Sequence, residues 1–391
     1  MKQIPPVDLT RQYQLIKAEA DSAVLDLLSS GRYIGGEAIA NFEREFAEYT
    51  AVSECISCNS GTDALFLALR ALDIGAGDEV ITTSFSFFAT AEVITRVGAK
   101  PIFIDLDPNT FNFDVTQIEQ AITPRTKAIM PVHLFGQPVD MTKLMAIAKQ
   151  HQLYVIEDCA QATGAIWSGQ KIGSMGDVGC FSFFPTKNLG GCGDGGAITT
   201  NNTALAKQMR ILKEHGSPER YRHDYVGINS RLDAVQAVIL SVKLPCLDYW
   251  NQQRQQAAQY YQELLQDVAA IELPQALSGG NSVWNQYTIR VRQLASSPRD
   301  NRGLLQQKLR ESGIISMIYY PIPLHLQPVY QDLGYEKGQL PRVELAAHEV
   351  LSLPMFPGIS AEEQDRVVES LKECLQEIGS LKSEEYLASS K

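Results

Sequence analysis

The amino-acid sequence predicts an α/β protein with a mostly parallel central sheet flanked by helices, plus a smaller α+β domain towards the C-terminus. Two observations carry this prediction. From about residue 54 to residue 200, short apolar runs alternate with helical periods; beyond residue 245, a long helical stretch leads into mixed strand and helix patterns. Repeated strand–helix–strand units favour parallel pairing with both faces of the sheet covered. Such sheets bind ligands at the carboxyl ends of their strands.

The strands of the large domain are expected in apolar runs that helical periods separate. In chain order these runs are "ECISC", "EVITTS", "KPIFID", "KAIMPVHL", "YVIED" and "CFSFF". The first helical period is "DALFLALRAL", and residues 203–213 and 230–243 read as later helices.

The small domain is expected to follow the long helix "LDYWNQQRQQAAQYYQELLQ". Its predicted elements are the strand "WNQYTIRV", the helix "RGLLQQKLRESG" and a last helix from about Ala361 to Ile378. We therefore divide the chain into a large domain of residues 1–245 and a small domain of residues 246–380. The polar residues 381–391 are expected to form a flexible tail.

Composition excludes several classes of protein. The 391 residues are 45% hydrophobic and 20% charged, as in globular proteins, and the formal net charge of −11 speaks against nucleic-acid binding. The N-terminus lacks a signal-peptide core, and no window is long enough to span a membrane. The seven scattered cysteines favour a reducing compartment, so we expect a cytoplasmic protein. Cys55 and Cys58 form a C-x-x-C without a second pair, which favours burial over a metal site.

Two short stretches at predicted strand ends carry polar groups. In "CNSGTDAL", residues 58–65, a strand runs into Ser60, Gly61 and Thr62 just before a helix. Free N–H groups at a helix start bind anions, although a simple helix cap explains the same residues. In "VIEDCAQA", Asp158 ends a strongly apolar strand, where it is either a catalytic carboxylate or a buried, hydrogen-bonded acid.

A lysine and several aromatic residues lie at two further strand ends. Lys187 stands in "CFSFFPTKNLGGCGDGGAITT", residues 180–200, between an aromatic run and a glycine-rich loop. Most lysines are solvated, but aromatic neighbours would desolvate this amine and favour its nucleophilic form. The glycines are expected to let a ligand lie close to the backbone. In "TTSFSFFATAE", Phe85, Phe87 and Phe88 are either core residues or, in one case, a plate for a planar ligand.

Together these features indicate a pyridoxal phosphate (PLP) site. PLP enzymes need a lysine for the Schiff base, a carboxylate for the pyridinium nitrogen and an anion site for the phosphate. The sequence contains no P-loop, and "GDGGA" does not match a dinucleotide fingerprint.

Over about residues 5–378 the sequence resembles the DegT/StrS family of PLP-dependent nucleotide-sugar aminotransferases, which have fold type I. The matching stretches are "GRYIGGEAIANFEREFAEY", "NSGTDAL", "GDEVITTSFSFFATAE", "VIEDCAQATGA", "SFFPTKNLGGCGDGGAI", "GINSRLDAVQAVIL" and "YYPIPLHLQPVY". The order and spacing of these stretches make the resemblance specific. It departs from the family at Phe87, where Tyr or Trp is common, and the glycine loop contains Cys192, to which we assign no function.

The resemblance implies roles for the cofactor-binding residues. Lys187 would form the Schiff base, and Asp158 would pair with the ring nitrogen. Gln161 would bind the 3-oxygen of the ring, and Phe87 would stack on the ring, while Phe85 packs in the core. The phosphate would be held by Gly61, Thr62, Ser182 and, from the partner subunit of a homodimer with shared active sites, Asn229.

The resemblance also implies residues for the substrate. Arg231 would meet a substrate carboxylate or phosphate across the dimer, with a structural salt bridge as the alternative. His325 in "PIPLHLQ" is a candidate sugar-binding residue, whereas His133 in "PVHLFG" is expected to be structural.

The implied reaction is transamination from L-glutamate, which leaves 2-oxoglutarate, to a nucleotide-linked keto sugar. Lys187 would act as the general acid–base. A 3-keto sugar is favoured, either a UDP-3-keto hexuronate or a dTDP-3-keto-6-deoxyhexose, and the amino sugar would enter a cell-surface polysaccharide or glycoconjugate. The alternatives are a 4-keto-sugar aminotransferase, a sugar dehydratase that uses pyridoxamine phosphate (PMP), and a non-catalytic regulator. The dehydratases of this scaffold lack the Schiff-base lysine, which this sequence retains.

Overall fold

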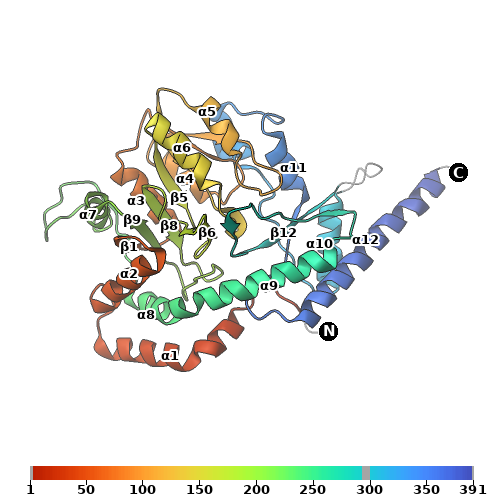
Figure 1. Ribbon diagram of the computed structural model, residues 1–391, viewed down its shortest axis with the longest axis horizontal. Coiled ribbons are helices and arrows are strands. Elements are labelled where there is room, and N and C mark those ends of the chain that lie inside the picture. The colour runs from red at the N-terminus through yellow and green to blue at the C-terminus, as the bar shows by residue number, and fades with distance from the viewer. Residues whose placement is uncertain (1–2, 293–299, 390–391) are drawn as a thin grey trace.

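A seven-stranded sheet forms the centre of the large domain (Figure 1). The computed structural model describes residues 3–292 and 300–389. Four neighbouring pairs are parallel, and only β9 runs against its neighbours β1 and β8. This confirms the predicted, mostly parallel sheet. In sheet order the strands are β1 (Glu54–Cys58), β9 (Gly196–Thr200), β8 (Val178–Ser182), β5 (Tyr154–Asp158), β4 (Thr126–Met130), β2 (Glu79–Thr83) and β3 (Lys100–Ile104).

Helices cover both faces of this sheet because its strands are apolar on both sides. Val80 and Ile156 pack on the face that α3 and α7 cover, whereas Ile81 and Val155 pack on the face that α6 covers. Phe42 of α2 lies with Phe181 in a third apolar cluster that α8 closes. The helices are α1 (Leu9–Ser30), α2 (Glu37–Thr50), α3 (Gly61–Ala71), α4 (Ala89–Arg96), α5 (Ile118–Ala121), α6 (Met141–His151), α7 (Thr203–Leu212) and α8 (Ala234–Lys243).

The small domain packs helices against a three-stranded antiparallel sheet in the order β10-β12-β13. A third sheet joins β11 (Gly280–Asn281) to β6 (Ile166–Trp167) and β7 (Gln170–Lys171). In the C-terminal part of the chain, these sheets and their helices comprise α9 (Leu247–Leu265), β10 (Ile271–Glu272), β12 (Tyr287–Val291), α10 (Asn301–Glu311), α11 (Pro341–Glu349), β13 (Val350–Leu353) and α12 (Ala361–Ser389). Short 3-10 turns lie at Val115–Gln117, Leu134–Gly136, Leu244–Cys246, Leu324–Leu326 and Pro328–Leu333.

Two details differ from the sequence prediction. Ile4 pairs with Ile314 and belongs to an apolar cluster with residues of α9, α10 and α12, although we assigned it to the large domain. The last helix does not end near 378 but runs to Ser389, and residues 381–389 therefore continue a helix where we expected a flexible tail. Residues 390 and 391 lie outside the described part of the chain.

The topology brings the predicted site stretches to one edge of the sheet. Because β9 is antiparallel to both of its neighbours, β1 runs in the same direction as β8, β5 and β2. The carboxyl ends of these four strands therefore lead into the stretches around Ser60, Lys187, Asp158 and Phe87 at the same edge. Among the described residues, no helix is both long and apolar enough to cross a membrane.

Candidate active site

Lys187 lies in a tight turn just beyond β8. Its backbone N–H donates to the carbonyl of Phe184 over 2.9 Å, and its side chain is partly buried. Burial lowers the pKa of the Lys187 amine from the usual 10.5 to about 8, against the opposing attraction of the Asp158 carboxylate. Near neutral pH, a useful fraction of this amine is therefore uncharged and nucleophilic.

Asp158 is the last residue of β5 and is buried. Its Oδ2 accepts from Thr90 Oγ1 over 2.9 Å, and its Oδ1 accepts from the backbone N–H of Ala160 over 3.1 Å. Burial raises the pKa of the Asp158 carboxyl, while these two hydrogen bonds and the Lys187 charge act in the opposite direction. The structure thus brings Asp158 and Lys187 together, with donors that stabilise the charged carboxylate.

The ends of β1 and β8 form a tight cradle at the N-terminus of α3. Ser60 caps this helix, and its Oγ accepts from the N–H of Asp63 over 3.1 Å. A Cβ on Gly61 would lie 2.7 Å from the Cβ of Ser182, so glycine is required for the two strand ends to approach. The N–H groups of Gly61 and Thr62 lie in the first turn of the helix, where a phosphate is favoured. The predicted helix cap is confirmed, and the anion site at the same helix start stays a prediction.

Phe87 and Gln161 both contact Tyr320. The Phe87 side chain is 59% exposed, and its ring centroid lies 6.4 Å from that of Tyr320. Gln161 donates from Nε2 to the Tyr320 hydroxyl over 3.0 Å and accepts at Oε1 from the N–H of Phe135 over 2.7 Å. Phe85 is fully buried and packs in the core, as predicted. An exposed aromatic ring and a buried, hydrogen-bonded amide thus both contact Tyr320.

Sequence reasoning did not single out Tyr320 or Thr90. The Tyr320 hydroxyl accepts from Gln161, its ring contacts Phe85 and Phe87, and burial raises its pKa, with Asp158 acting in the same direction. The stretch "YYPIPLHLQPVY" was recognised, but no spacing links it to a strand end so distant in the chain. Thr90 lies in "FFATAE", and only its contact with Asp158 shows its importance.

The glycine loop after Lys187 makes close contacts with protein, and the expected approach of a ligand to its backbone stays a prediction. A Cβ on Gly191 or Gly193 would lie 2.7 or 2.9 Å from side-chain atoms of Gln236 in α8. A Cβ on Gly195 would lie 2.8 Å from Leu232, and one on Gly196 would clash with the backbone of Ser60. These glycines let the loop pack against Gln236 of α8, against Leu232 and against the start of α3.

Three predicted residues do not join Lys187 within this chain. Asn229 is exposed, and Arg231 Nη1 lies 3.4 Å from Glu214 Oε2, the salt bridge that we considered as the alternative. His325 is only 1% exposed; its Nδ1 is hydrogen-bonded to Ser84 Oγ over 2.6 Å and its Nε2 to Glu344 over 3.4 Å. Both ring nitrogens of His325 are engaged inside the protein, which does not fit the predicted contact with the sugar.

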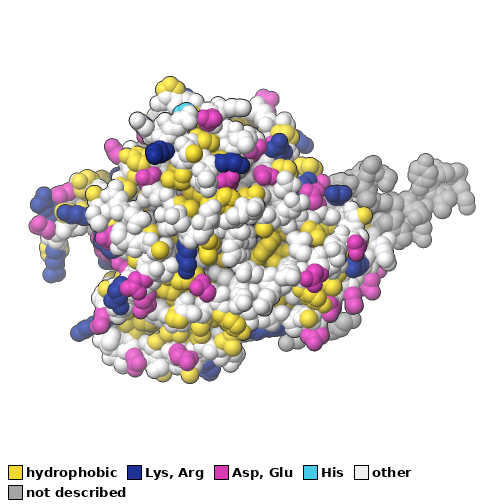
Figure 2. Space-filling view, in the orientation of Figure 1, with side chains coloured by type: hydrophobic (Ala, Val, Ile, Leu, Met, Phe, Trp, Pro, Cys, Tyr) yellow, Lys and Arg dark blue, Asp and Glu magenta, His cyan; other side chains and the backbone are white. Residues whose placement is uncertain are grey.

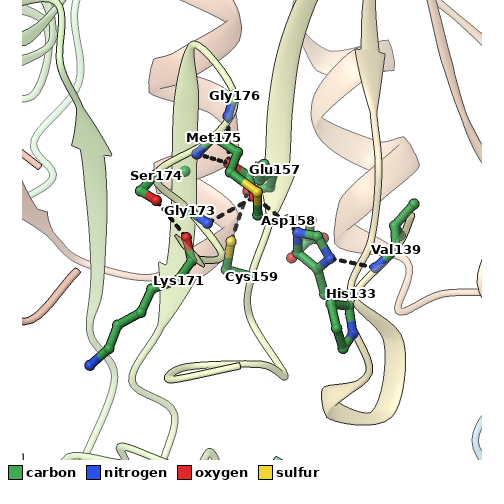
Figure 3. Close-up of polar contacts among 12 residues, drawn as sticks. His133, Val139, Glu157, Asp158, Cys159, Lys171, Gly173, Ser174, Met175 and Gly176 are labelled. Atoms are coloured by element: carbon green, nitrogen blue, oxygen red, sulfur yellow. Dashed lines mark hydrogen bonds and ion pairs between the residues drawn. The ribbon is translucent and has the colours of Figure 1, made fainter. Parts of the chain in front are cut away.

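Behind Asp158, on the same strand, a buried polar cluster surrounds Glu157 (Figure 3). The ring of His133 is fully buried; its Nδ1 accepts from the N–H of Val139, so its Nε2 donates to Glu157 over 3.1 Å. This confirms that His133 is structural. The backbone N–H groups of Gly173, Met175 and Gly176 also donate to the Glu157 carboxylate, over 2.7–2.9 Å.

The residue types of this cluster could bind a metal ion, but their protonation and hydrogen bonding do not favour it. Ligand atoms of His133, Glu157 and Cys159 lie within 4.8 Å of one another. Burial raises the pKa of the Cys159 thiol well above its usual value, so the thiol stays protonated, and the other two groups are already hydrogen-bonded. The cluster therefore acts as a support for β5. Cys55 and Cys58 are buried free thiols, as expected.

An amine of lowered pKa, a buried carboxylate and a helix N-terminus at one sheet edge match the requirements of a PLP site. Comparison with known proteins identifies the same class. The chain belongs to the DegT/DnrJ/EryC1/StrS aminotransferase family, whose model matches residues 14–372. The protein is thus a PLP enzyme, and other proteins of this fold have been solved in PLP and PMP forms.

Individual relatives match along nearly the whole chain. The "Pleiotropic regulatory protein" of Geobacillus stearothermophilus is 49% identical over 372 residues, which cover 95% of this chain and 98% of that protein. The UDP-N-acetyl-3-dehydro-alpha-D-glucosamine 3-aminotransferase of Acidithiobacillus ferrooxidans is 45% identical over 95% of this chain and 98% of its own length. The crystal structure of DesV from S. venezuelae superposes with a TM-score of 0.91 at 40% identity, covering 95% of this chain and 98% of that chain.

Proposed function

We propose that this protein transfers an amino group from L-glutamate to C3 of a keto sugar carried on UDP or dTDP. Relatives at 40–45% identity carry names of this reaction class, on both carriers. One of them is named for a UDP-linked 3-oxo-glucuronate and two for dTDP-linked 3-amino deoxyhexoses. The amino sugar would enter a cell-surface polysaccharide or glycoconjugate.

The pairing of Lys187 with Asp158 is the observation that carries this proposal. PLP, when bound, supplies an aldehyde for the lysine and a ring that accepts electrons from the donor's Cα. Lys187 Nζ would hold the aldehyde between turnovers and then move the proton released at Cα, since its lowered pKa lets it act near neutral pH. Asp158, held by Thr90, would keep the ring nitrogen protonated.

The remaining residues would bind and orient the cofactor. The phosphate fits the N-terminus of α3, where Gly61, Thr62 and Ser182 meet. Phe87, exposed beside the site, would stack on one face of the ring, and Gln161 would direct its amide to the 3-oxygen. There is no room for a side chain at position 61, so a ligand bound here would be held by backbone N–H groups.

We also propose a homodimer in which each chain completes the site of its partner. Figure 2 shows hydrophobic side chains along the lower edge of the molecule, over α1. A cavity of about 700 Å³ lies between α1 and the glycine loop. The exposed Asn229 would reach the partner's phosphate, and Arg231 would exchange Glu214 for a substrate anion. The large exposed apolar residues in this region are Leu9, Tyr13, Leu15, Leu25, Leu28, Tyr33, Ile34 and Phe184.

Two further observations bear on where and how the protein works. All seven cysteines are free, which fits a reducing compartment and the proposed cytoplasmic location. Lys187 and its buried partner Asp158 are both present, which favours turnover over a purely regulatory role and over a dehydratase that dispenses with the lysine.

The test is a two-part assay on purified, PLP-loaded protein. Glutamate should bleach the visible absorbance of the cofactor, and 2-oxoglutarate should restore it, because the two half-reactions are separable in ping-pong kinetics. Glutamate consumption should then be followed with UDP- and dTDP-linked 3-keto and 4-keto sugars. Turnover only with a 4-keto sugar would contradict the proposed position, and failure to bleach would contradict the proposed donor.

A further inference from the structure

Both neighbours of Lys187 in the chain are tied to one short segment, Val283–Asn285, which precedes β12. The side chain of Asn285 donates from Nδ2 to the carbonyl of Thr186 over 3.2 Å. On the other side, buried Asn188 donates from Nδ2 to the carbonyl of Val283 over 2.9 Å and to Asn251 Oδ1 over 2.7 Å. The backbone that carries Lys187 is thus clamped on both sides by residues from beyond the large-domain sheet.

The same segment contacts the turn that fixes Gln161. The N–H of Val283 donates to the carbonyl of Gly136 over 2.9 Å. A Cβ on Gly136 would lie 2.8 Å from the backbone nitrogens of Trp284 and Asn285, so the two backbones touch. The preceding residue, Phe135, donates its N–H to Gln161 Oε1. One segment therefore contacts both the lysine turn and the turn whose Phe135 N–H holds Gln161.

Arg254 of α9 holds this segment from behind. Its side chain is 1% exposed, and its Nη1 donates to the carbonyls of Trp284, Asn285 and Met355 over 3.1–3.2 Å. Within the described residues its hydrogen-bond acceptors are all backbone carbonyls, and burial lowers the pKa of this guanidinium to about 10. Burying a cation against neutral groups costs stability. The retention of such an arrangement is consistent with a need to hold the backbone of Trp284 and Asn285 in one position.

We propose that Val283–Asn285, anchored by Arg254, is a positioning element for Lys187, and that Asn285 and Asn188 are its positioning residues. The inference rests on the proposed function, in which Lys187 binds the cofactor aldehyde. A lysine side chain has four rotatable bonds, so the place of its amine depends on a fixed backbone. A displacement of about 1 Å at a reacting group can cost about 100-fold in rate. Arg254 also links this element to Met355 after β13, which connects the core of the small domain to the catalytic turn.

The test compares Asn285→Ala and Asn188→Ala with the control Asn281→Ala in the PLP-loaded enzyme. Asn281 lies on β11 close by, and its exposed side chain accepts only from Gln255 among the contacts described. We expect kcat per mole of borohydride-trapped lysine to fall about 10- to 100-fold in the first two variants, with KM for glutamate within about threefold. The pH midpoint of the visible cofactor absorbance should shift, because Lys187 moves relative to Asp158. The control should match the wild type.

Two outcomes would overturn the inference. The first is a wild-type kcat and an unshifted absorbance midpoint in both Asn285→Ala and Asn188→Ala, even if their melting temperatures fall. If Asn285→Ala does not fold, Asn285→Asp keeps the shape but removes the donor to Thr186, and it is judged by the same two readouts. The second is a borohydride label on a lysine other than Lys187 in the wild type, which would also overturn the proposed function. A labelled Lys187 with unchanged variants would overturn only the positioning role.

Discussion

The lowered pKa of Lys187 makes a quantitative prediction about its reactivity. Burial brings this pKa from 10.5 to about 8, while the nearby Asp158 carboxylate raises it. At pH 7 about a tenth of the amine is then neutral, roughly 300-fold more than for a lysine with the usual pKa. Replacing Asp158 with Asn removes the opposing negative charge, so the pKa of Lys187 should fall below about 8 and its neutral fraction at pH 7 should rise.

The assay is competitive labelling of cofactor-free protein with an amine-reactive reagent, followed by quantification of the Lys187 peptide at a series of pH values. Half-maximal reactivity is expected near pH 8 for the wild type and at lower pH for Asp158→Asn. A short lysine peptide in the same tube gives the reactivity of a solvated amine. A wild-type midpoint at or above pH 10, or an upward shift in Asp158→Asn, would refute the argument that burial controls this amine.

Three further substitutions test the surroundings of the site. Gly61→Ala places a methyl group 2.7 Å from the Cβ of Ser182, so thermal melts should show a loss of about 1–3 kcal/mol in the free energy of unfolding. Equilibrium titration should show a weaker affinity for PLP, and an unchanged affinity would mean that this helix start does not bind the cofactor. In Glu157→Gln an NH₂ group, which cannot accept hydrogen bonds, faces backbone N–H donors, so urea unfolding should show a loss of at least about 3 kcal/mol in the free energy of unfolding. An unchanged stability would mean that the cluster does not support β5. Phe87→Ala should change unfolding by less than about 0.5 kcal/mol because the ring is exposed, yet weaken PLP binding about 2- to 10-fold; equal binding would exclude stacking.

Several strands and helices of the large domain could be predicted because each carries a local signal, whereas α1, α2 and β9 were not among the elements expected from the sequence. The run "YVIED" is apolar and short, and it became β5 with Asp158 at its end. The pairing of Ile4 with Ile314 could not be predicted, because a contact between residues so distant in sequence leaves no periodic pattern. The length of α12 was missed because its last residues are polar and have no apolar stripe to mark a helix.

The candidate site divides in the same way. Asp158 ends β5, while Gly61 and Lys187 lie in the segments that follow β1 and β8, so the common direction of these three strands brings the residues to one edge of the sheet. The supports around them could not be inferred, since Thr90, Tyr320 and the Asn residues beside Lys187 act through tertiary contacts alone. The glycine loop shows the limit most clearly. Its composition indicated that some group approaches the loop backbone closely. Only the structure reveals that the side chain of Gln236 in α8 lies against two of the glycines.

The most direct test of the account is the position of the covalent link between the chain and its cofactor. PLP-loaded enzyme should be reduced with borohydride, digested and mapped by mass spectrometry. The account predicts that the reduced cofactor is attached to Lys187, the amine whose pKa burial lowers beside Asp158. A fully loaded enzyme that carries the label on another lysine, or no label, would contradict it.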